Sequence, residues 1–256
     1  GCKLFIWGLF KKVVIADRLA IYVNRIYEDP DLYNGPTLAL ATVFFAIQIY
    51  CDFSGYSDMA IGTAKILGFD LKQNFNLPYF SRSIADFWKR WHISLSSWFS
   101  DYLYKPLGGN RVNYHRWLFN ILIVFIVSGF WHGASWTFII WGLLHGIYYF
   151  LENWGDAFLK LMNQSKIKTY YFYKVFKTVL VFFSVCYAWV FFRASNITEA
   201  FTISYKLFFD WNGYLYLGAS SVTFILCLIL IALLFFVQVL QSKGIVSLYF
   251  SSSKAH

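Results

Sequence analysis

The feature that most constrains the fold of this chain is the run of residues 219–241, which carries no charged side chain along its whole length. As a helix, such a run is long enough to cross the hydrocarbon core of a bilayer, which takes about 20 apolar residues. The composition agrees, because 59% of the residues are hydrophobic and only 14% are charged, against roughly 25% charged in a soluble domain. We therefore predict an all-α, polytopic membrane protein.

The formal net charge of +9 raises the question of nucleic acid binding. Lys and Arg fall mostly between apolar runs, which is typical of cytoplasmic loops, and no basic module stands apart from these runs. We therefore predict no nucleic acid partner.

The four cysteines lie in or near apolar stretches and include no C-x-x-C pair. They are expected to be small buried hydrophobes, with neither a disulfide framework nor a metal site.

The first part of the chain mixes charge with apolar residues. Residues 3–27 predict an interfacial helix, or a short tilted span whose lysines snorkel to the membrane surface. Residues 37–69 predict one or two helices with a polar break near 50–58, where Asp52 and Asp58 interrupt the hydrophobicity. Such a break is tolerated where it lines a cavity or is buried in protein. Because the chain does not begin with Met and opens on a half-formed apolar segment, we expect a fragment of a longer protein.

Residues 84–103 show helical periodicity, and they predict one amphipathic helix lying in a membrane interface. Ser83 or Ser81 is expected to cap this helix, and Pro106 with the following glycines to end it. His92 lies at the edge of its apolar stripe. The stripe contains Ile84, Phe87, Trp88, Trp91, Leu95, Trp98, Phe99, Tyr102 and Leu103.

Two apolar runs, 117–131 and 135–151, flank His132 and predict a helical hairpin. The loops on either side, 105–116 and 160–177, are both basic, so the positive-inside rule places both in the cytoplasm. The first run has 15 residues and would rise only about 22 Å as a helix. Since the hydrocarbon core is ~30 Å thick, we expect the tip of the hairpin, with His132, to lie deep in the membrane. Residues 175–192, 199–210 and 219–241 predict three further helices.

An ionisable side chain at membrane depth is by default a functional hypothesis. A neutral imidazole is a good general base, and it could deprotonate a hydroxyl that attacks an acyl carbonyl. The alternative is that His132 is structural and bonds a carbonyl across the hairpin. His145 is interpreted as packing or helix–helix hydrogen bonding. Asp52, Asp58 and Asp101 are candidates for orienting a histidine or for pairing with Lys or Arg.

Four stretches carry a resemblance to a known family: residues 50–62, 86–99, 101–111 and 129–136. Together they resemble the membrane-bound O-acyltransferase family, over about residues 4–155 and most specifically over 50–136. The ending Pro-Leu-Gly-Gly-Asn-Arg of the third stretch looks like the alginate O-acetyltransferase branch. The branch that transfers D-alanine to teichoic acid is the alternative.

This resemblance implies one membrane-embedded domain over residues 1–256, with short tilted, re-entrant and interfacial helices around a central cavity. It also implies that His132 is the catalytic histidine and that His92 is a second polar residue near the reaction path. Further residues are expected to support the reaction or to position the acyl group: Trp88, Arg90, Trp91, Asp101 and Trp131.

The activity implied is transfer of an acetyl group, across or at the cell inner membrane, to a cell-surface polysaccharide such as alginate. Acetyl-CoA or another acyl donor is expected as substrate, with no bound cofactor. The expected partners are membrane lipids, the polysaccharide acceptor and periplasmic or extracellular acetyltransferases. Two other classes remain open from the residues alone. One is a proton-coupled transporter that uses His132 as a relay, and the other is a scaffold in which His132 is replaceable.

Overall fold

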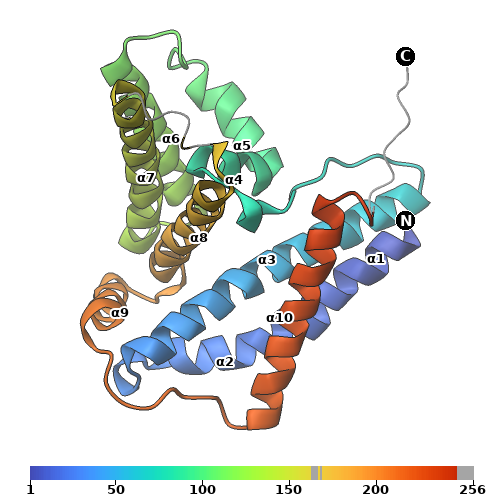
Figure 1. Ribbon diagram of the computed structural model, residues 1–256. Coiled ribbons are helices and arrows are strands. Elements are labelled where there is room, and N and C mark those ends of the chain that lie inside the picture. Colours follow the sequence, from blue (N-terminus) through green and yellow to red (C-terminus); the bar gives the residue numbers. More distant parts are fainter. Residues whose placement is uncertain (163–166, 168, 247–256) are drawn as a thin grey trace. The chain divides into compact units, whose positions relative to one another are not determined.

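The computed structural model describes residues 1–162, 167 and 169–246, so Lys166 and Lys168 of the second basic loop lie outside the described residues. Every regular element in this part of the chain is helical (Figure 1), which confirms the all-α prediction. Four described helices are long and apolar enough to cross a membrane, which confirms the polytopic prediction. They are α3 (Gly35–Ile66), α6 (Tyr114–His132), α8 (Tyr171–Arg193) and α10 (Ser221–Ser242).

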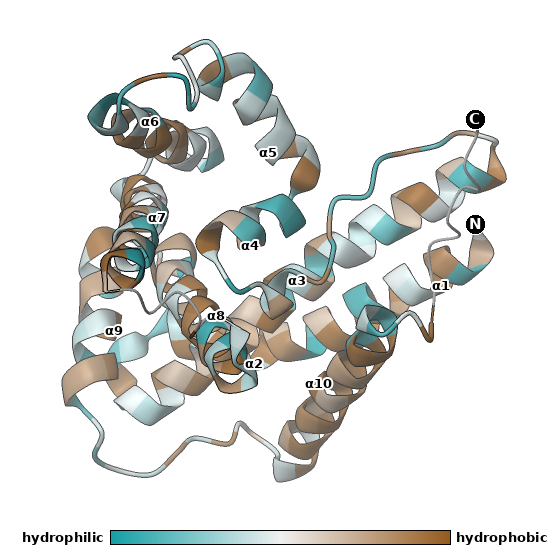
Figure 2. Ribbon diagram, turned by 45° about the horizontal axis from the view of Figure 1, so that its top comes forward, coloured by the Kyte–Doolittle hydropathy of each residue, from teal (hydrophilic) through white to brown (hydrophobic). Residues whose placement is uncertain are grey.

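The described residues form two compact units. The first contains residues 1–73 and 212–246, and the second contains residues 74–211. The single domain expected over the whole chain stays a prediction. Within the first unit, α10 is hydrophobic along nearly all of its length (Figure 2), as the charge-free run at 219–241 predicts.

The first unit begins with one continuous helical segment. It consists of α1 (Cys2–Leu9), the π-helical turn η1 (Phe10–Ala16) and α2 (Asp17–Glu28), and it packs along α3. The expected snorkelling does not describe Lys11, whose side chain is 4% exposed. Its ammonium group instead pairs with Asp58 of α3 at 2.8 Å and donates to Ser54 Oγ at 2.8 Å. The adjacent Lys12 pairs with Asp52, also on α3.

Of the one or two helices predicted over residues 37–69, the structure contains one, because α3 continues without interruption from Gly35 to Ile66. Its two carboxylates are satisfied by lysines of the neighbouring helical segment, so the backbone has no need to open. Gly55 serves a second purpose, since it lies against Gly8 of α1. A Cβ added at Gly55 would lie 2.7 Å from the Gly8 carbonyl oxygen. Glycine is therefore needed here for close helix approach.

The segment before α10 is tied to the start of α3 and to α2. The Asn34 side chain donates to the backbone carbonyls of Asn212 and Tyr214, at 2.8 and 3.1 Å. Tyr22 donates its hydroxyl to the carbonyl of Tyr216, and the Tyr22 ring packs 6.1 Å from Phe224 of α10. These contacts hold residues 212–246 against the N-terminal helices although the two are far apart in sequence.

The second unit is built on a helical hairpin of α6 and α7 (Trp136–Leu161), which confirms the predicted hairpin. Two glycines let the helices approach closely. A Cβ at Gly129 would collide with the backbone carbonyl of Phe138, and a Cβ at Gly142 with that of Phe125. Helix α8 packs against α7, and α9 (Ile197–Phe209) against α8. The predicted helices at 175–192 and 199–210 are thereby confirmed.

Helix α6 is longer than the apolar run that predicted it, because it begins at Tyr114 and has 19 residues. It rises about 28 Å, close to the ~30 Å of a hydrocarbon core. The side chain of Asn113 caps it by accepting from the backbone N–H of Arg116 at 2.9 Å. The expected depth of His132 therefore does not follow from a short helix.

The single amphipathic helix predicted over 84–103 is wrong. The segment contains α4 (Ile84–Arg90), α5 (Ile93–Phe99) and the π-helical turn η4 (Ser100–Tyr104), with a break between α4 and α5. The predicted cap is confirmed, since Ser83 Oγ accepts from the backbone N–H of Asp86 at 2.8 Å. The break falls at Trp91 and His92, and it determines where the second predicted histidine lies.

Candidate active site

His132 is the last residue of α6 and is followed by the short turn into α7. The turn is fixed by Gly129, which brings α6 onto α7, and by Ser135, whose hydroxyl accepts from the Thr137 backbone N–H at 3.4 Å. The imidazole is thus placed by a helix end and a capped helix start on a tight hairpin. Such a placement restricts its orientation far more than a loop would.

Aromatic rings surround the His132 imidazole. Ring centroids of Trp131, Trp141 and Phe192 lie 4.9, 5.1 and 5.1 Å from its own, and that of Phe138 lies at 6.4 Å. No hydrogen bond to either imidazole nitrogen comes from the part of the chain that the structure describes. The ring is partly exposed, so the group is not sealed in packed protein. A lone pair on this imidazole is available to accept a proton.

His92 lies in the break between α4 and α5 with a left-handed backbone, φ 45° and ψ 55°. For a residue with a Cβ this conformation costs on the order of 1–2 kcal/mol. The residues of 74–76 stabilise it: Ile93 N–H donates to the Asn74 carbonyl at 3.0 Å, and Asn76 N–H to the Arg90 carbonyl at 2.9 Å. Strained backbone that is held in this way is often found at functional sites.

The break brings the two predicted histidines to the same tryptophan. The Trp131 ring lies 6.3 Å from the His92 ring and 4.9 Å from the His132 ring, measured between centroids. Burial lowers the pKa of His92 from its ordinary value of 6.5 to about 4, and a positive charge on His132 acts in the same direction. His92 is therefore neutral at physiological pH.

Trp88, Arg90 and Trp91 lie on or just after α4, and each is already engaged. The Trp88 indole N–H donates to His145 Nδ1 at 3.3 Å. Arg90 pairs with Asp86 at 2.7 Å, one helical turn away. Trp91 is buried, with its ring stacked 5.5 Å from that of Phe87. These contacts position α4, and the donors of Trp88 and Arg90 are not directed at an open space.

The predicted aspartates pair with lysines. Asp101 pairs with Lys105 at 2.5 Å, and its side chain is 53% exposed. Asp52 and Asp58 belong to the first unit, where each pairs with a lysine. The pairing alternative is therefore the one observed for all three carboxylates. Among the described residues, no group of His, Cys, Asp and Glu side chains could hold a metal ion.

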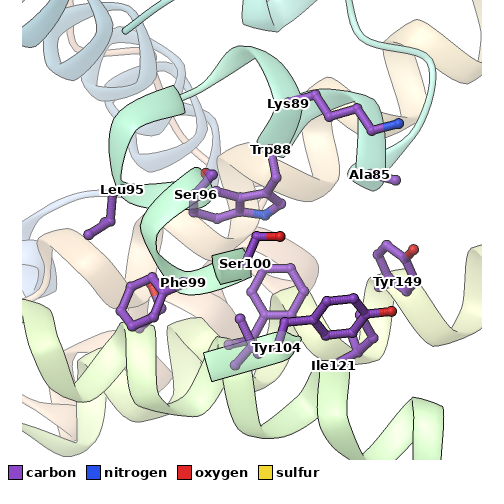
Figure 3. A pocket seen from close by; sticks show the side chains of 13 residues that line it. Ala85, Trp88, Lys89, Leu95, Ser96, Phe99, Ser100, Tyr104, Ile121 and Tyr149 are labelled. Atoms are coloured by element: carbon purple, nitrogen blue, oxygen red, sulfur yellow. The ribbon is translucent and has the colours of Figure 1, made fainter. Parts of the chain in front are cut away.

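A cavity of about 260 Å³ lies between α4, α5, η4 and the α6–α7 hairpin (Figure 3). Its lining is largely apolar, and Ser96, Ser100 and Lys89 contribute polar groups. Trp88 lies in its wall. Ser128, also a lining residue, precedes His132 by one turn of α6. The cavity therefore adjoins the helix turn that carries His132, although His132 itself does not line it.

A comparison with known protein families identifies the family of this chain. The model of the MBOAT, membrane-bound O-acyltransferase family, matches residues 2–194. The chain belongs to this family. The match covers both predicted histidines, and it confirms the resemblance seen in the four sequence stretches.

Individual relatives point to the same branch of the family. The chain is 42% identical over 214 residues to a probable alginate O-acetylase of Azotobacter vinelandii, covering 83% of this chain and 41% of that protein. It is 42% identical over 204 residues to a peptidoglycan O-acetyltransferase of Helicobacter pylori, covering 79% and 37%. Identity to a teichoic acid D-alanyltransferase of Bacillus subtilis is 30% over 204 residues, covering 74% and 49%.

The chain thus spans less than half the length of each of these relatives. Its higher identity to the O-acetylases than to the D-alanyltransferase agrees with the predicted branch.

The sequence did not predict the break at His92, since the apolar stripe continues through it. The helix–helix hydrogen bonding predicted for His145 is confirmed, but its partner Trp88 was not predicted, because 57 positions separate the two residues.

Proposed function

We propose that this chain carries out O-acyl transfer in the cell inner membrane. An acyl group, most simply acetyl from acetyl-CoA, is passed to a hydroxyl group on the route to a cell-surface polysaccharide. Alginate and peptidoglycan are the acceptors that the names of two relatives suggest. Membrane lipids and periplasmic or extracellular acetyltransferases complete the proposed set of partners.

One observation carries this proposal: His132 has no hydrogen bond within the described residues and sits in a cage of aromatic rings at a rigid hairpin. The structural alternative predicts a bond from His132 to a carbonyl across this turn, and the described residues contain no such bond. A general base, in contrast, needs a lone pair that the resting protein leaves available.

The proposed reaction needs no cofactor and no redox step. The hydroxyl oxygen of the acceptor attacks the acyl carbonyl carbon while its proton passes to His132. The bond between the acyl carbon and the thioester sulfur then breaks, and the leaving thiolate takes the proton from the imidazolium. The products are an ester and a free thiol, and His132 returns to its neutral form.

His92 is proposed to act together with His132, since the rings of both lie near that of Trp131. Its low pKa keeps it neutral, so it can donate one hydrogen bond without adding a second positive charge. In that role it would hold the acyl carbonyl oxygen as negative charge develops on it. The cavity beside Trp88 is the proposed place for the acyl group, since its lining is largely apolar.

The test is acetyl transfer to polysaccharide in membranes that carry the full-length protein. His132→Ala is compared with His115→Ala, which removes an exposed histidine from the start of α6, at matched expression. We expect His132→Ala to abolish transfer and His115→Ala to retain it. Undiminished transfer by folded His132→Ala would contradict the proposal and favour a scaffold.

Two further measurements on the same membranes test the alternative functions. D-alanyl transfer without acetyl transfer would assign the chain to the branch that transfers D-alanine to teichoic acid. A proton flux that requires His132, without any acyl transfer, would favour the transporter.

A further inference from the structure

His145 is completely buried where three helices of the second unit meet. Its ring contacts Phe87 and Trp88 of α4, Phe125 of α6, and Trp141 of its own helix α7. One polar contact stands out in this apolar surrounding: the indole N–H of Trp88 lies 3.3 Å from His145 Nδ1. A histidine that only filled space could be replaced by any ring of similar size.

The direction of this hydrogen bond fixes the protonation of His145. An indole nitrogen can only donate, so Nδ1 must be the acceptor and carry no proton. The neutral ring then carries its proton on Nε2, which has no partner among the described residues. A doubly protonated imidazole would place a donor against a donor and break the bond. The contact therefore exists only while His145 is neutral.

Trp88 connects this bond to the candidate site. Its indole forms part of the cavity wall, with Ser96 and Ser100 close to it (Figure 3). Its ring centroid also lies 5.7 Å from that of Trp141, which in turn lies 5.1 Å from the His132 ring. His145 thus contacts both the tryptophan in the cavity wall and the tryptophan that packs on His132.

We infer that His145 is a positioning residue, which holds the Trp88 indole in the cavity wall through its Nδ1 acceptor and so sets the size of acyl group that reaches His132. The inference rests on the proposed function. Without the acceptor, the indole N–H points at a fully buried side chain that offers it no partner, so the ring turns to find a new one. The wall of the cavity then changes shape although no residue that touches the acyl group has been altered.

The test uses two substitutions of equal size in the full-length protein. In His145→Asn the side-chain oxygen can take the place of Nδ1, whereas His145→Leu has the same shape and no acceptor. Each variant is given acetyl and propionyl donors in turn. We expect His145→Leu to change the ratio of acetyl to propionyl transfer by roughly fivefold or more, the equivalent of one hydrogen bond, and His145→Asn to stay close to the wild-type ratio.

Trp88→Phe supplies the control, because it removes the donor. In that background, His145→Asn and His145→Leu should give the same ratio. A purely structural role would instead lower both transfers together, or separate the two variants in the Trp88→Phe background as well, and either result overturns the inference.

A second measurement does not depend on activity. The protein is labelled with 5-fluorotryptophan, and the ¹⁹F signal that disappears in Trp88→Phe is assigned to Trp88. This signal should move in His145→Leu and stay near its wild-type position in His145→Asn. An unmoved signal in His145→Leu overturns the positioning role. Absence of acetyl transfer by the wild type would instead overturn the proposed function, so the two failures are distinguishable.

Discussion

Lys11 and Asp58 form an ion pair within the first unit, with 2.8 Å between Lys11 Nζ and Asp58 Oδ2 and with each side chain 4% exposed. Both side chains are removed from water, and each is the partner that makes the other tolerable. A buried charge without a partner is far more costly than a buried pair. The pair therefore fixes how the N-terminal helical segment lies along α3.

Removing one member of this pair should be strongly destabilising. We expect Lys11→Met to cost about 3–5 kcal/mol, because it leaves the Asp58 carboxylate buried alone. The double variant Lys11→Met with Asp58→Leu should recover most of that loss. The measurement is thermal unfolding in detergent of the wild type and these two variants. The partly exposed neighbour pair offers the control: Lys12→Met should cost below about 1 kcal/mol. Equal losses for Lys11→Met and Lys12→Met would contradict the importance of burial.

Replacing glycine by alanine should have opposite effects on stability at two positions of the α6–α7 hairpin. Gly129→Ala places a Cβ against the Phe138 backbone carbonyl, so α6 must move away from α7. We expect a loss of about 1–3 kcal/mol in stability, together with reduced transfer, since His132 follows Gly129 by three residues. In Gly155→Ala the new Cβ meets nothing within 4 Å, and stability should stay level or rise by up to about 1 kcal/mol. If Gly129→Ala and Gly155→Ala changed the unfolding temperature by the same amount, the close approach of α6 and α7 at Gly129 would be contradicted.

The left-handed backbone at His92 should affect stability independently of the imidazole ring. Because its φ is 45°, His92→Gly should be more stable than His92→Ala by about 1 kcal/mol, since glycine adopts the left-handed region without strain. Both variants lose the ring, so both should show the same reduced acetyl transfer. The measurements are unfolding temperature and transfer rate, and an alanine variant as stable as the glycine variant would argue against the break.

The low pKa of His92 predicts acid sensitivity. Its folded pKa of about 4 lies below the ordinary value of 6.5, so between these values the unfolded chain binds more protons than the folded protein. Stability contributed by the neutral ring is thus complete above pH 6.5 and is lost as the pH falls toward 4. In His92→Gln the unfolding temperature should fall less steeply over this range. Parallel curves for wild type and variant would show that His92 does not titrate as described.

By itself, the sequence determined the membrane class, the α6–α7 hairpin, most of the later helices and the identity of the two candidate histidines. Those features depend on local signals: charge-free runs long enough to span lipid, a cap such as Ser83, and motifs confined to neighbouring positions. The family match confirms the resemblance that these motifs carried. Hydrophobic length and short-range spacing are visible without any knowledge of packing.

Tertiary structure alone decided the remaining features. The periodicity at 84–103 continues through His92, but pairing with Asn74 and Asn76 breaks the helix there. Asp52 and Asp58 do not interrupt α3, because lysines 40 or more residues away satisfy both carboxylates. His145 likewise acquires its acceptor role only when α4 packs on α7. In each case a contact with a residue distant in sequence decides the outcome, and only the folded structure brings the two residues together.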